Sequence, residues 1–150
     1  MTRTHIPASL RRAVLERAAE HCEYCRYPQA GALLAFEIEH IISEKHGGAT
    51  ILDNLALACP YCNRFKGTDL GSLDPETGEL TAFFNPRTQV WSEHFRLEGA
   101  VIAPLTPIGR VTTLILQFNT PTASLSANIS FARANTHDWL HPPPNPRPLA

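Results

Sequence analysis

Two identical short cysteine motifs constrain this chain more than any other feature of its sequence. Cys22 and Cys25 form one C-x2-C pair, Cys59 and Cys62 form another, and the 33 residues 26–58 separate them. Two such pairs are typical of a tetrahedral structural zinc site, in which each short loop supplies two thiolates to one ion. The chain has no further cysteine. The spacing therefore predicts one closed Zn²⁺ site with four protein ligands and no open position for a substrate water.

Two other uses of the cysteines are less favoured. Disulfide-bonded or simply buried cysteines are one alternative, but we expect a cytoplasmic protein, in which thiols stay reduced. Residues 1–18 lack the apolar core of a secretory signal, and no apolar run approaches the ~20 residues of a membrane helix. A thioredoxin-like redox pair is the second alternative, and it would leave the other C-x2-C pair unexplained.

The net charge gives only mild guidance about partners. It is −1 at pH 7, whereas many nucleic-acid-binding domains are basic, so it argues weakly against such a role. The charge is uneven: residues 1–27 carry five arginines and three glutamates, and residues 69–98 carry six acids and two arginines. A surface that faces phosphates would therefore involve the N-terminal half of the chain.

Hydrophobic periodicity and turn residues predict a single domain of mixed α and β structure. We expect residues 1–141 to form it, with a core over about 22–67 and an extension over about 68–141, and the proline-rich residues 142–150 to be a disordered tail. The expected elements are helices over 7–20, 60–66, 86–94 and from Pro107 onward, strands over 35–42 and 55–58, a loop at 45–48, a turn at 74–78, and a hairpin over 95–105 that turns at Glu98-Gly99. In the last helix, Val111, Leu114, Ile115 and Phe118 are expected to form an apolar stripe.

A group of polar residues lies between and just after the cysteine pairs. Glu39-His40 falls in the first predicted strand, Gly47-Gly48 in the predicted loop, and Asn54 just before the second strand. Asn63 follows Cys62 directly. The stretch FEIEHIISEKHGGATILDNLALACPYCNRFKG resembles the HNH endonuclease motif. In that motif an acidic residue and a histidine end a strand, a glycine-bearing loop and an asparagine follow, and a C-x2-C knuckle leads into a short helix.

The resemblance runs from about Cys22 to Gly67, and FFNPRTQVWSEHF and LTPIGR also resemble an extension of bacterial HNH proteins. It implies an α+β fold with a zinc-clasped ββα-metal core, similar to a treble clef, an N-terminal helix and a C-terminal α/β extension. It also implies a metal-dependent endonuclease, encoded by a bacterium or a phage, that acts on DNA in the cytoplasm, away from membranes. The sequence leaves open whether the protein is a monomer or a homodimer.

The resemblance implies a role for each polar residue of the motif. His40 would be the general base, Glu39 and Asn63 would hold one catalytic Mg²⁺ or Mn²⁺, and Asn54 would brace the loop and so orient His40. Lys66 would approach a phosphate or the loop backbone. Arg64 and His46 would join Lys66 in contacting the nucleic acid.

These residue types suit hydrolysis of a phosphodiester, which is anionic and repels hydroxide. Histidine can accept a proton from water near neutral pH, and a hard cation can stabilise charge on the phosphate and the leaving oxygen. Two positions depart from the commonest pattern, since glutamate replaces aspartate at 39 and asparagine replaces histidine at 63. A regular strand would point Glu39 and His40 to opposite faces, so one site can use both only where the strand ends or twists.

Each of these residues also has an ordinary structural interpretation. Taken alone, His40 could be structural, Glu39 a solvated carboxylate, Asn54 a turn residue, Asn63 a helix cap and Lys66 an exposed helix-end cation. The alternative function is accordingly an inactive zinc-ribbon module that binds DNA or acts as a scaffold. A thiol redox protein is the third possibility.

Overall fold

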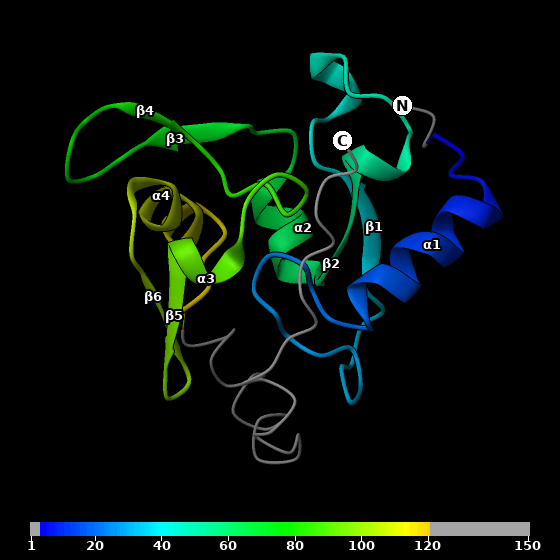
Figure 1. Cartoon of the computed structure of the whole chain (residues 1–150), viewed down its shortest axis with the longest axis horizontal. Coiled ribbons are helices and arrows are strands. Elements are labelled where there is room, and N and C mark those ends of the chain that lie inside the picture. Colours follow the sequence, from blue (N-terminus) through cyan, green and yellow to red (C-terminus); the bar gives the residue numbers. More distant parts are fainter. Residues whose placement is uncertain (1–3, 121–150) are drawn as a thin grey trace.

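The computed structural model describes residues 4–120, so the predicted tail and residues 121–141 of the predicted extension lie outside the described residues. Short helices and strands both occur, which confirms the mixed α and β class. Figure 1 shows residues 4–67 and 68–120 side by side. The helix α2 (Pro60–Lys66), which ends the first part, lies next to the second. None of the described helices is long and apolar enough to cross a membrane.

The helix α1 (Ala8–Ala18) matches the helix predicted over 7–20. Pro7 precedes it, as is common for a residue whose φ is fixed near the helical value. Val14 and Ala18 are buried and lie on one face of α1, four residues apart. The neighbouring Leu15 is 41% exposed. The buried face packs on the strand β2 (Leu55–Ala58).

The strands β1 (Glu37–His40) and β2 form an antiparallel sheet of two strands. The 3-10 helices η1 (Glu44–His46) and η2 (Leu52–Asn54) lie in the connection between them. β1 is shorter than the strand predicted over 35–42, because the chain bends at residues 41 and 42 directly after His40.

The register of this sheet separates its two faces. Ile38 pairs with Leu57 and His40 with Leu55, and directly paired residues lie on the same face of an antiparallel sheet. Ile38, Leu55 and Leu57 pack with Val14 of α1 in one apolar cluster. On the other face, Glu37 pairs with Ala58 and Glu39 with Ala56, and these alanines belong to the cluster that contains the cysteines.

The helix α2 follows β2 directly and has the bounds predicted from the sequence. Pro60 occupies its first turn, and the Cys59 side chain accepts a hydrogen bond from the backbone N–H of Cys62 at 3.4 Å. The helix ends at Gly67, whose φ is +51°. The order strand, strand, helix and the contacts of α2 with both strands give residues 37–66 a β-β-α arrangement.

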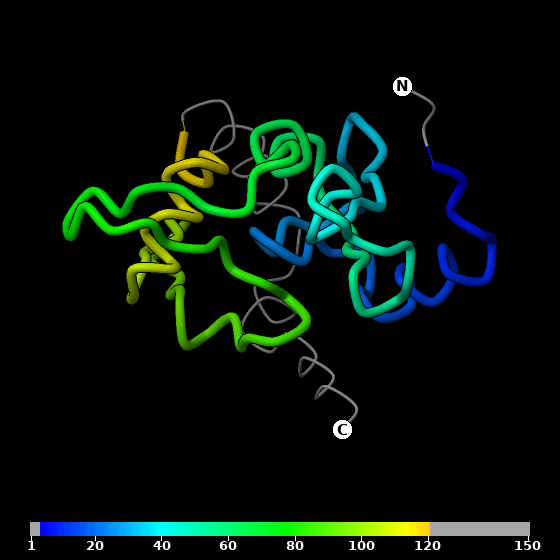
Figure 2. Tube along the Cα trace, turned by 90° about the horizontal axis from the view of Figure 1, so that it is seen from above, coloured from blue at the N-terminus to red at the C-terminus, as the bar shows by residue number. Residues whose placement is uncertain are grey.

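Residues 68–120 add two hairpins and two helices. Their elements are β3 (Gly71–Leu73), β4 (Leu80–Ala82), α3 (Trp91–His94), β5 (Phe95–Glu98), β6 (Val101–Pro104) and α4 (Pro107–Ile115). β3 and β4 pair with each other around the predicted turn, and β5 and β6 form the predicted hairpin. Thr106 caps α4 by accepting the N–H of Gly109. The turn of the β3–β4 hairpin and α1 lie at opposite ends of the molecule (Figure 2).

Two predictions in the extension are wrong. The helix expected over 86–94 is confined to the four residues of α3. Residues 86–88 form a turn instead, in which the Asn85 N–H donates to Gln89 Oε1 and the Asn85 backbone and side-chain oxygens accept from the N–H groups of residues 87–89. Leu114, expected in the apolar stripe, is 55% exposed, whereas Val111 is fully buried.

The extension and the cysteine region share one apolar core. Phe84, Trp91 and Phe95 pack in the same buried cluster as Cys22 and Tyr24. The indole Nε1–H of Trp91 donates to the Tyr24 carbonyl at 2.8 Å, which ties α3 to the first knuckle. The extension therefore forms one body with the cysteine-containing part of the chain.

We predict unequal effects for two neighbouring threonines of α4. Thr112 Oγ1 accepts the Phe84 N–H at 2.8 Å and is fully buried, whereas the buried Thr113 Oγ1 has no hydrogen-bond partner among the described residues. Thr112→Val should lower the free energy of unfolding by about 1–3 kcal/mol, because it leaves a buried N–H unpaired. Thr113→Val, the matched control, should be neutral or slightly stabilising. Urea denaturation measures both, and equal losses would contradict this assignment.

Candidate metal centre and active site

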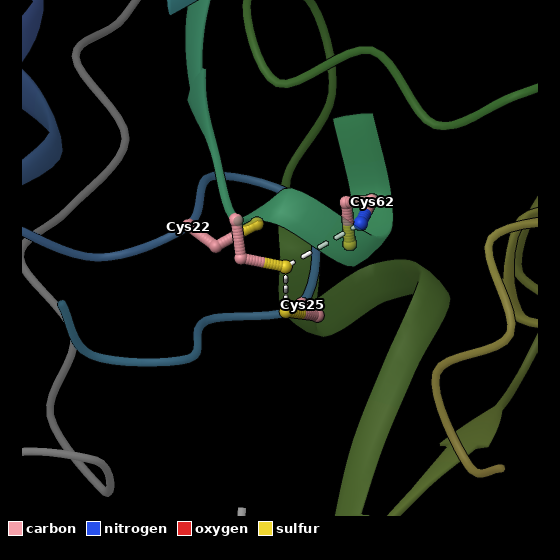
Figure 3. A group of neighbouring side chains, drawn as sticks. Cys22, Cys25 and Cys62 are labelled. Atoms are coloured by element: carbon pink, nitrogen blue, oxygen red, sulfur yellow. Dashed lines mark hydrogen bonds between the residues drawn. The ribbon is translucent and has the colours of Figure 1, made fainter. Parts of the chain in front are cut away.

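The side chains of the four cysteines converge where the turn after α1 meets the junction of β2 and α2. Cys22 and Cys25 lie in the turn that follows α1, and Cys59 and Cys62 lie where β2 passes into α2. Figure 3 shows the side chains of Cys22, Cys25 and Cys62 pointing into one small volume. Three of the four cysteines are buried and Cys25 is partly buried. All four cysteines of the two C-x2-C motifs belong to one cluster, whereas a redox pair would use only one of the motifs.

The sulfur positions fit a zinc ion. All four Sγ atoms lie within 4.8 Å of one another, and the Sγ atoms of Cys25 and Cys59 are 3.8 Å apart. Zinc–thiolate bonds are about 2.3 Å long, so neighbouring sulfurs of a regular tetrahedral site would be ~3.8 Å apart. The cluster is therefore compatible with the predicted structural zinc site in both ligand chemistry and size.

The thiols also influence each other's ionisation. Hydrogen bonds from the Cys22 and Cys25 side chains hold the pKa of Cys59 far below its usual range. The pKa of Cys25 is raised, chiefly by its contact with Cys22, and burial raises the pKa of Cys62. The cluster thus favours the charged form of Cys59, and four thiolates together would need a central cation.

A buried glutamate in the first knuckle connects this centre to the rest of the fold. Glu23 Oε2 accepts the Leu57 N–H at 2.8 Å, and the Glu23 N–H donates to the Leu57 carbonyl at 2.9 Å. The same carboxylate forms ion pairs with Arg17 of α1 and with Arg87 of the extension. Because the carboxylate accepts one backbone and two guanidinium contacts, the knuckle is attached to β2 by contacts in addition to the cysteines.

Asn54 joins the two ends of the loop that follows β1. Its Oδ1 accepts the Ile42 N–H, and its Nδ2 donates to the carbonyls of Ile42 and Ala49, each at 2.9 Å. Gly48 allows this close packing, since a Cβ at that position would lie 1.7 Å from the Ile42 carbonyl oxygen. The amide therefore fixes the chain immediately after His40.

His40 is the last residue of β1 and is partly buried. Its Nε2 lies 2.9 Å from Thr50 Oγ1, which comes from the far end of the same loop. β1 ends at His40, and the register places the side chains of Glu39 and His40 on opposite faces of the sheet. Thr50 was not identified from the sequence, because nothing in its local context indicates a partner ten residues away.

Glu39 lies in a buried polar group with Tyr24 and Lys66. The Tyr24 hydroxyl donates to Glu39 Oε1, and Lys66 Nζ donates to Glu39 Oε2 at 3.0 Å. Tyr24, Lys66 and Glu39 are 0%, 2% and 8% exposed. Burial raises the pKa of Glu39, while the charge of Lys66 and the Tyr24 hydrogen bond oppose that rise. Both carboxylate oxygens therefore have a donor within the protein.

Lys66 does not lie at the surface as an exposed helix-end cation would. The resemblance implied contact with a phosphate or with the loop backbone, and Lys66 Nζ donates to the His40 carbonyl at 3.2 Å. Lys66 thus contacts both residues of the Glu39-His40 pair. A contact with a phosphate would require it to leave Glu39.

The remaining predicted residues lie apart from this buried group. The Asn63 side chain donates to Glu37 Oε2 at 2.5 Å, so it is paired with the carboxylate two residues before Glu39 on the same strand face. Arg64 and His46 are both exposed. Glu37 was also not identified from the sequence, although its position two residues before Glu39 is a signal that strand alternation could have provided.

We predict that the cysteine cluster binds one Zn²⁺ per chain and that folding depends on it. Cys59→Ser should abolish stoichiometric zinc binding and lower the melting temperature, because metal binding at such a site is coupled to folding. Elemental analysis and thermal denaturation measure the two effects, with Thr113→Val as a zinc-retaining control. A purified wild-type protein that is folded, free of zinc and fully reactive toward a thiol reagent at all four cysteines would contradict the prediction.

Comparison with known proteins gives one match. Searches of curated proteins and of solved structures found nothing significantly similar to this chain. A family model described as HNH endonuclease matches residues 22–69. The matched segment begins at the first cysteine and contains all four, together with β1, β2 and α2. Residues 22–69 of this chain are therefore similar to the HNH endonuclease family, as the sequence motif indicated.

Proposed function

We propose that the protein is a metal-dependent endonuclease that hydrolyses DNA phosphodiester bonds with His40 as its general base. One observation carries this proposal: His40 ends β1 inside the matched family segment, directly after the buried Glu39 in the chain and directly before a loop that Asn54 braces. The zinc-clasped ββα-metal fold belongs to the same proposal, supported by the β-β-α arrangement of residues 37–66 and the four-cysteine cluster.

The proposed role of His40 follows from the chemistry of the substrate. A water molecule must lose a proton as it attacks phosphorus, and a neutral imidazole nitrogen can accept that proton. The Nε2 atom of His40 contacts Thr50 Oγ1, and this contact would limit rotation of the ring. Asn54 would act indirectly, by holding the backbone on the C-terminal side of His40 in one conformation.

Glu39 and Asn63 are the proposed ligands of the catalytic Mg²⁺ or Mn²⁺. When bound, the cation would stabilise negative charge on the phosphate and the leaving oxygen. A carboxylate and an amide oxygen are suitable donors for such hard cations. The Glu39 oxygens are now engaged by Lys66 and Tyr24, and the Asn63 amide by Glu37, so cation binding would exchange some of these contacts.

The proposed DNA surface includes Arg64 and His46, which are exposed, and Lys66 if it leaves Glu39. Phosphate contacts of this kind supply affinity without reading the base sequence.

The second candidate function is a zinc module that binds DNA or acts as a scaffold without cleaving. The observation that favours it is the internal pairing of Glu39, whose carboxylate oxygens already accept from Tyr24 and Lys66 within the protein. A plasmid assay separates the candidates, because only the endonuclease converts supercoiled plasmid to other forms in the presence of Mg²⁺ or Mn²⁺. A single site should produce nicked circles before linear plasmid.

We predict that His40→Ala lowers the cleavage rate by about 10²–10⁴-fold, the usual contribution of general-base catalysis. Zinc content and DNA affinity should change little, because neither depends on a proton acceptor. The exposed His5 serves as a matched control, and His5→Ala should cleave like the wild type. If His40→Ala cleaves normally, the base is another residue, and if it loses zinc or unfolds, His40 is structural.

We also predict that Glu39→Gln raises the Mg²⁺ concentration required for half-maximal cleavage and lowers the maximal rate. Removing the charge leaves Lys66 buried without a counter-charge, so Glu39→Asp, which keeps the carboxylate, is the variant that controls for stability. Glu39→Asp should retain cation-dependent cleavage. The exposed Glu44 provides a second control, Glu44→Gln. Wild-type cation dependence in Glu39→Gln would exclude Glu39 as a ligand.

A further inference from the structure

The two cysteine knuckles carry a tyrosine at the same place but use it differently. Tyr24 precedes Cys25 in Cys22-Glu-Tyr-Cys25, and Tyr61 precedes Cys62 in Cys59-Pro-Tyr-Cys62. Tyr24 is fully buried and its hydroxyl donates to Glu39, whereas Tyr61 is partly exposed and its hydroxyl has no hydrogen bond to residues 4–120. The first tyrosine therefore has a polar contact that its position in the knuckle does not by itself require.

A backbone hydrogen bond and two neighbouring cysteines fix the position of Tyr24. Its carbonyl accepts the Trp91 indole N–H at 2.8 Å, and it lies two residues after Cys22 and directly before Cys25. The Tyr24 hydroxyl is the donor of the hydrogen bond to Glu39 Oε1, since a carboxylate oxygen can only accept. Glutamate has three rotatable side-chain bonds, and a fixed donor at Oε1 removes much of that freedom.

The two partners of Glu39 differ in how they would respond to a divalent cation. The ammonium of Lys66 is positive and would compete with a cation at Oε2, since like charges repel strongly in a buried site. The Tyr24 hydroxyl is neutral and occupies the other oxygen. Of the two contacts, the Tyr24 hydrogen bond is thus the one that can persist while Glu39 binds a cation.

We propose that Tyr24 is a positioning residue for the cation site: its hydroxyl holds the Glu39 carboxylate and connects the four-cysteine centre to the catalytic end of β1. The inference rests on the proposed function, because it takes Glu39 as a cation ligand. Donors that orient a metal-binding carboxylate typically change metal affinity or activity by about 10- to 100-fold when they are removed.

The test compares Tyr24→Phe with Tyr61→Phe in the full-length, zinc-loaded protein. Both changes remove one hydroxyl from the same position of a knuckle and keep the ring. The first measurement is Mn²⁺ binding without DNA, followed by the electron paramagnetic resonance signal of free Mn²⁺. The second is the dependence of plasmid nicking on Mn²⁺ concentration.

Tyr24→Phe should keep one zinc per chain and raise the Mn²⁺ concentration for half-saturation by about 10- to 100-fold in both measurements. Its maximal nicking rate at saturating Mn²⁺ should approach that of the wild type, since His40 is untouched. Tyr61→Phe should match the wild type throughout. In a Glu39→Gln background, Tyr24→Phe should cause no additional loss of Mn²⁺ affinity, because the carboxylate that it positions is absent.

Three outcomes would overturn the inference. If Tyr24→Phe binds Mn²⁺ and nicks plasmid like the wild type, Tyr24 does not position Glu39, and the proposed nuclease function stands. If Tyr24→Phe loses zinc or unfolds, Tyr24 is a structural residue of the knuckle. If the wild-type protein itself neither binds Mn²⁺ nor nicks plasmid, the proposed function fails and the inference fails with it.

Discussion

The four thiols that meet between α1, β2 and α2 determine how the elements of the candidate site are placed. Cys22 and Cys25 follow α1, whereas Cys59 joins the end of β2 to the start of α2. A sheet of two short strands is marginal on its own, and closing the loop between the knuckles costs conformational entropy. A bound ion would offset that cost. The contacts of Glu23 with Leu57 and with two arginines add to the attachment of the same junction.

The sheet separates two apolar clusters, and the candidate catalytic residues lie where it ends. One face packs on α1 through Leu55 and Leu57, and the other belongs to the core that contains the cysteines and the extension. Glu39 points to the cysteine side, and His40 pairs with Leu55 on the opposite face. Since β1 stops at His40, Lys66 can contact the Glu39 carboxylate and the His40 carbonyl together, which links the two faces.

Local signals in the sequence were sufficient where one segment determines its own structure. Cys59-Pro60 and Gly67 fixed the bounds of α2, because capping, a first-turn proline and a positive φ are local requirements. Asn85-Pro86 carries a similar signal and yet begins a turn, in which the Gln89 side chain accepts the Asn85 N–H. The β3–β4 hairpin was not predicted, and its paired residues Leu73 and Leu80 are both exposed, so it lacks the usual apolar alternation.

The contacts of the site that could not be predicted from the sequence join residues that are far apart along the chain. Glu39 and Lys66 are 27 residues apart, and each taken alone is expected to be a solvated charge, but both are buried. The cysteine convergence was predictable because zinc coordination demands four ligands at one point, whatever elements carry them. No comparable rule specifies which lysine or tyrosine completes a buried carboxylate, so the roles of Lys66 and Tyr24 became apparent only from their contacts.

The buried pair of Glu39 and Lys66 is difficult to explain by stability alone. Desolvating two charges offsets most of their attraction, and well-packed apolar residues of similar volume often stabilise a fold as well or better. Burial raises the pKa of Glu39, which means that its charged form is disfavoured by the surroundings and gains from any nearby cation. Removing one partner would leave the other buried without compensation, at a cost of about 3–5 kcal/mol. In the absence of a divalent ion, Lys66 therefore supplies the charge that lets the protein fold around a pre-positioned carboxylate. The same low dielectric that makes the pair costly would strengthen the attraction between Glu39 and a divalent cation.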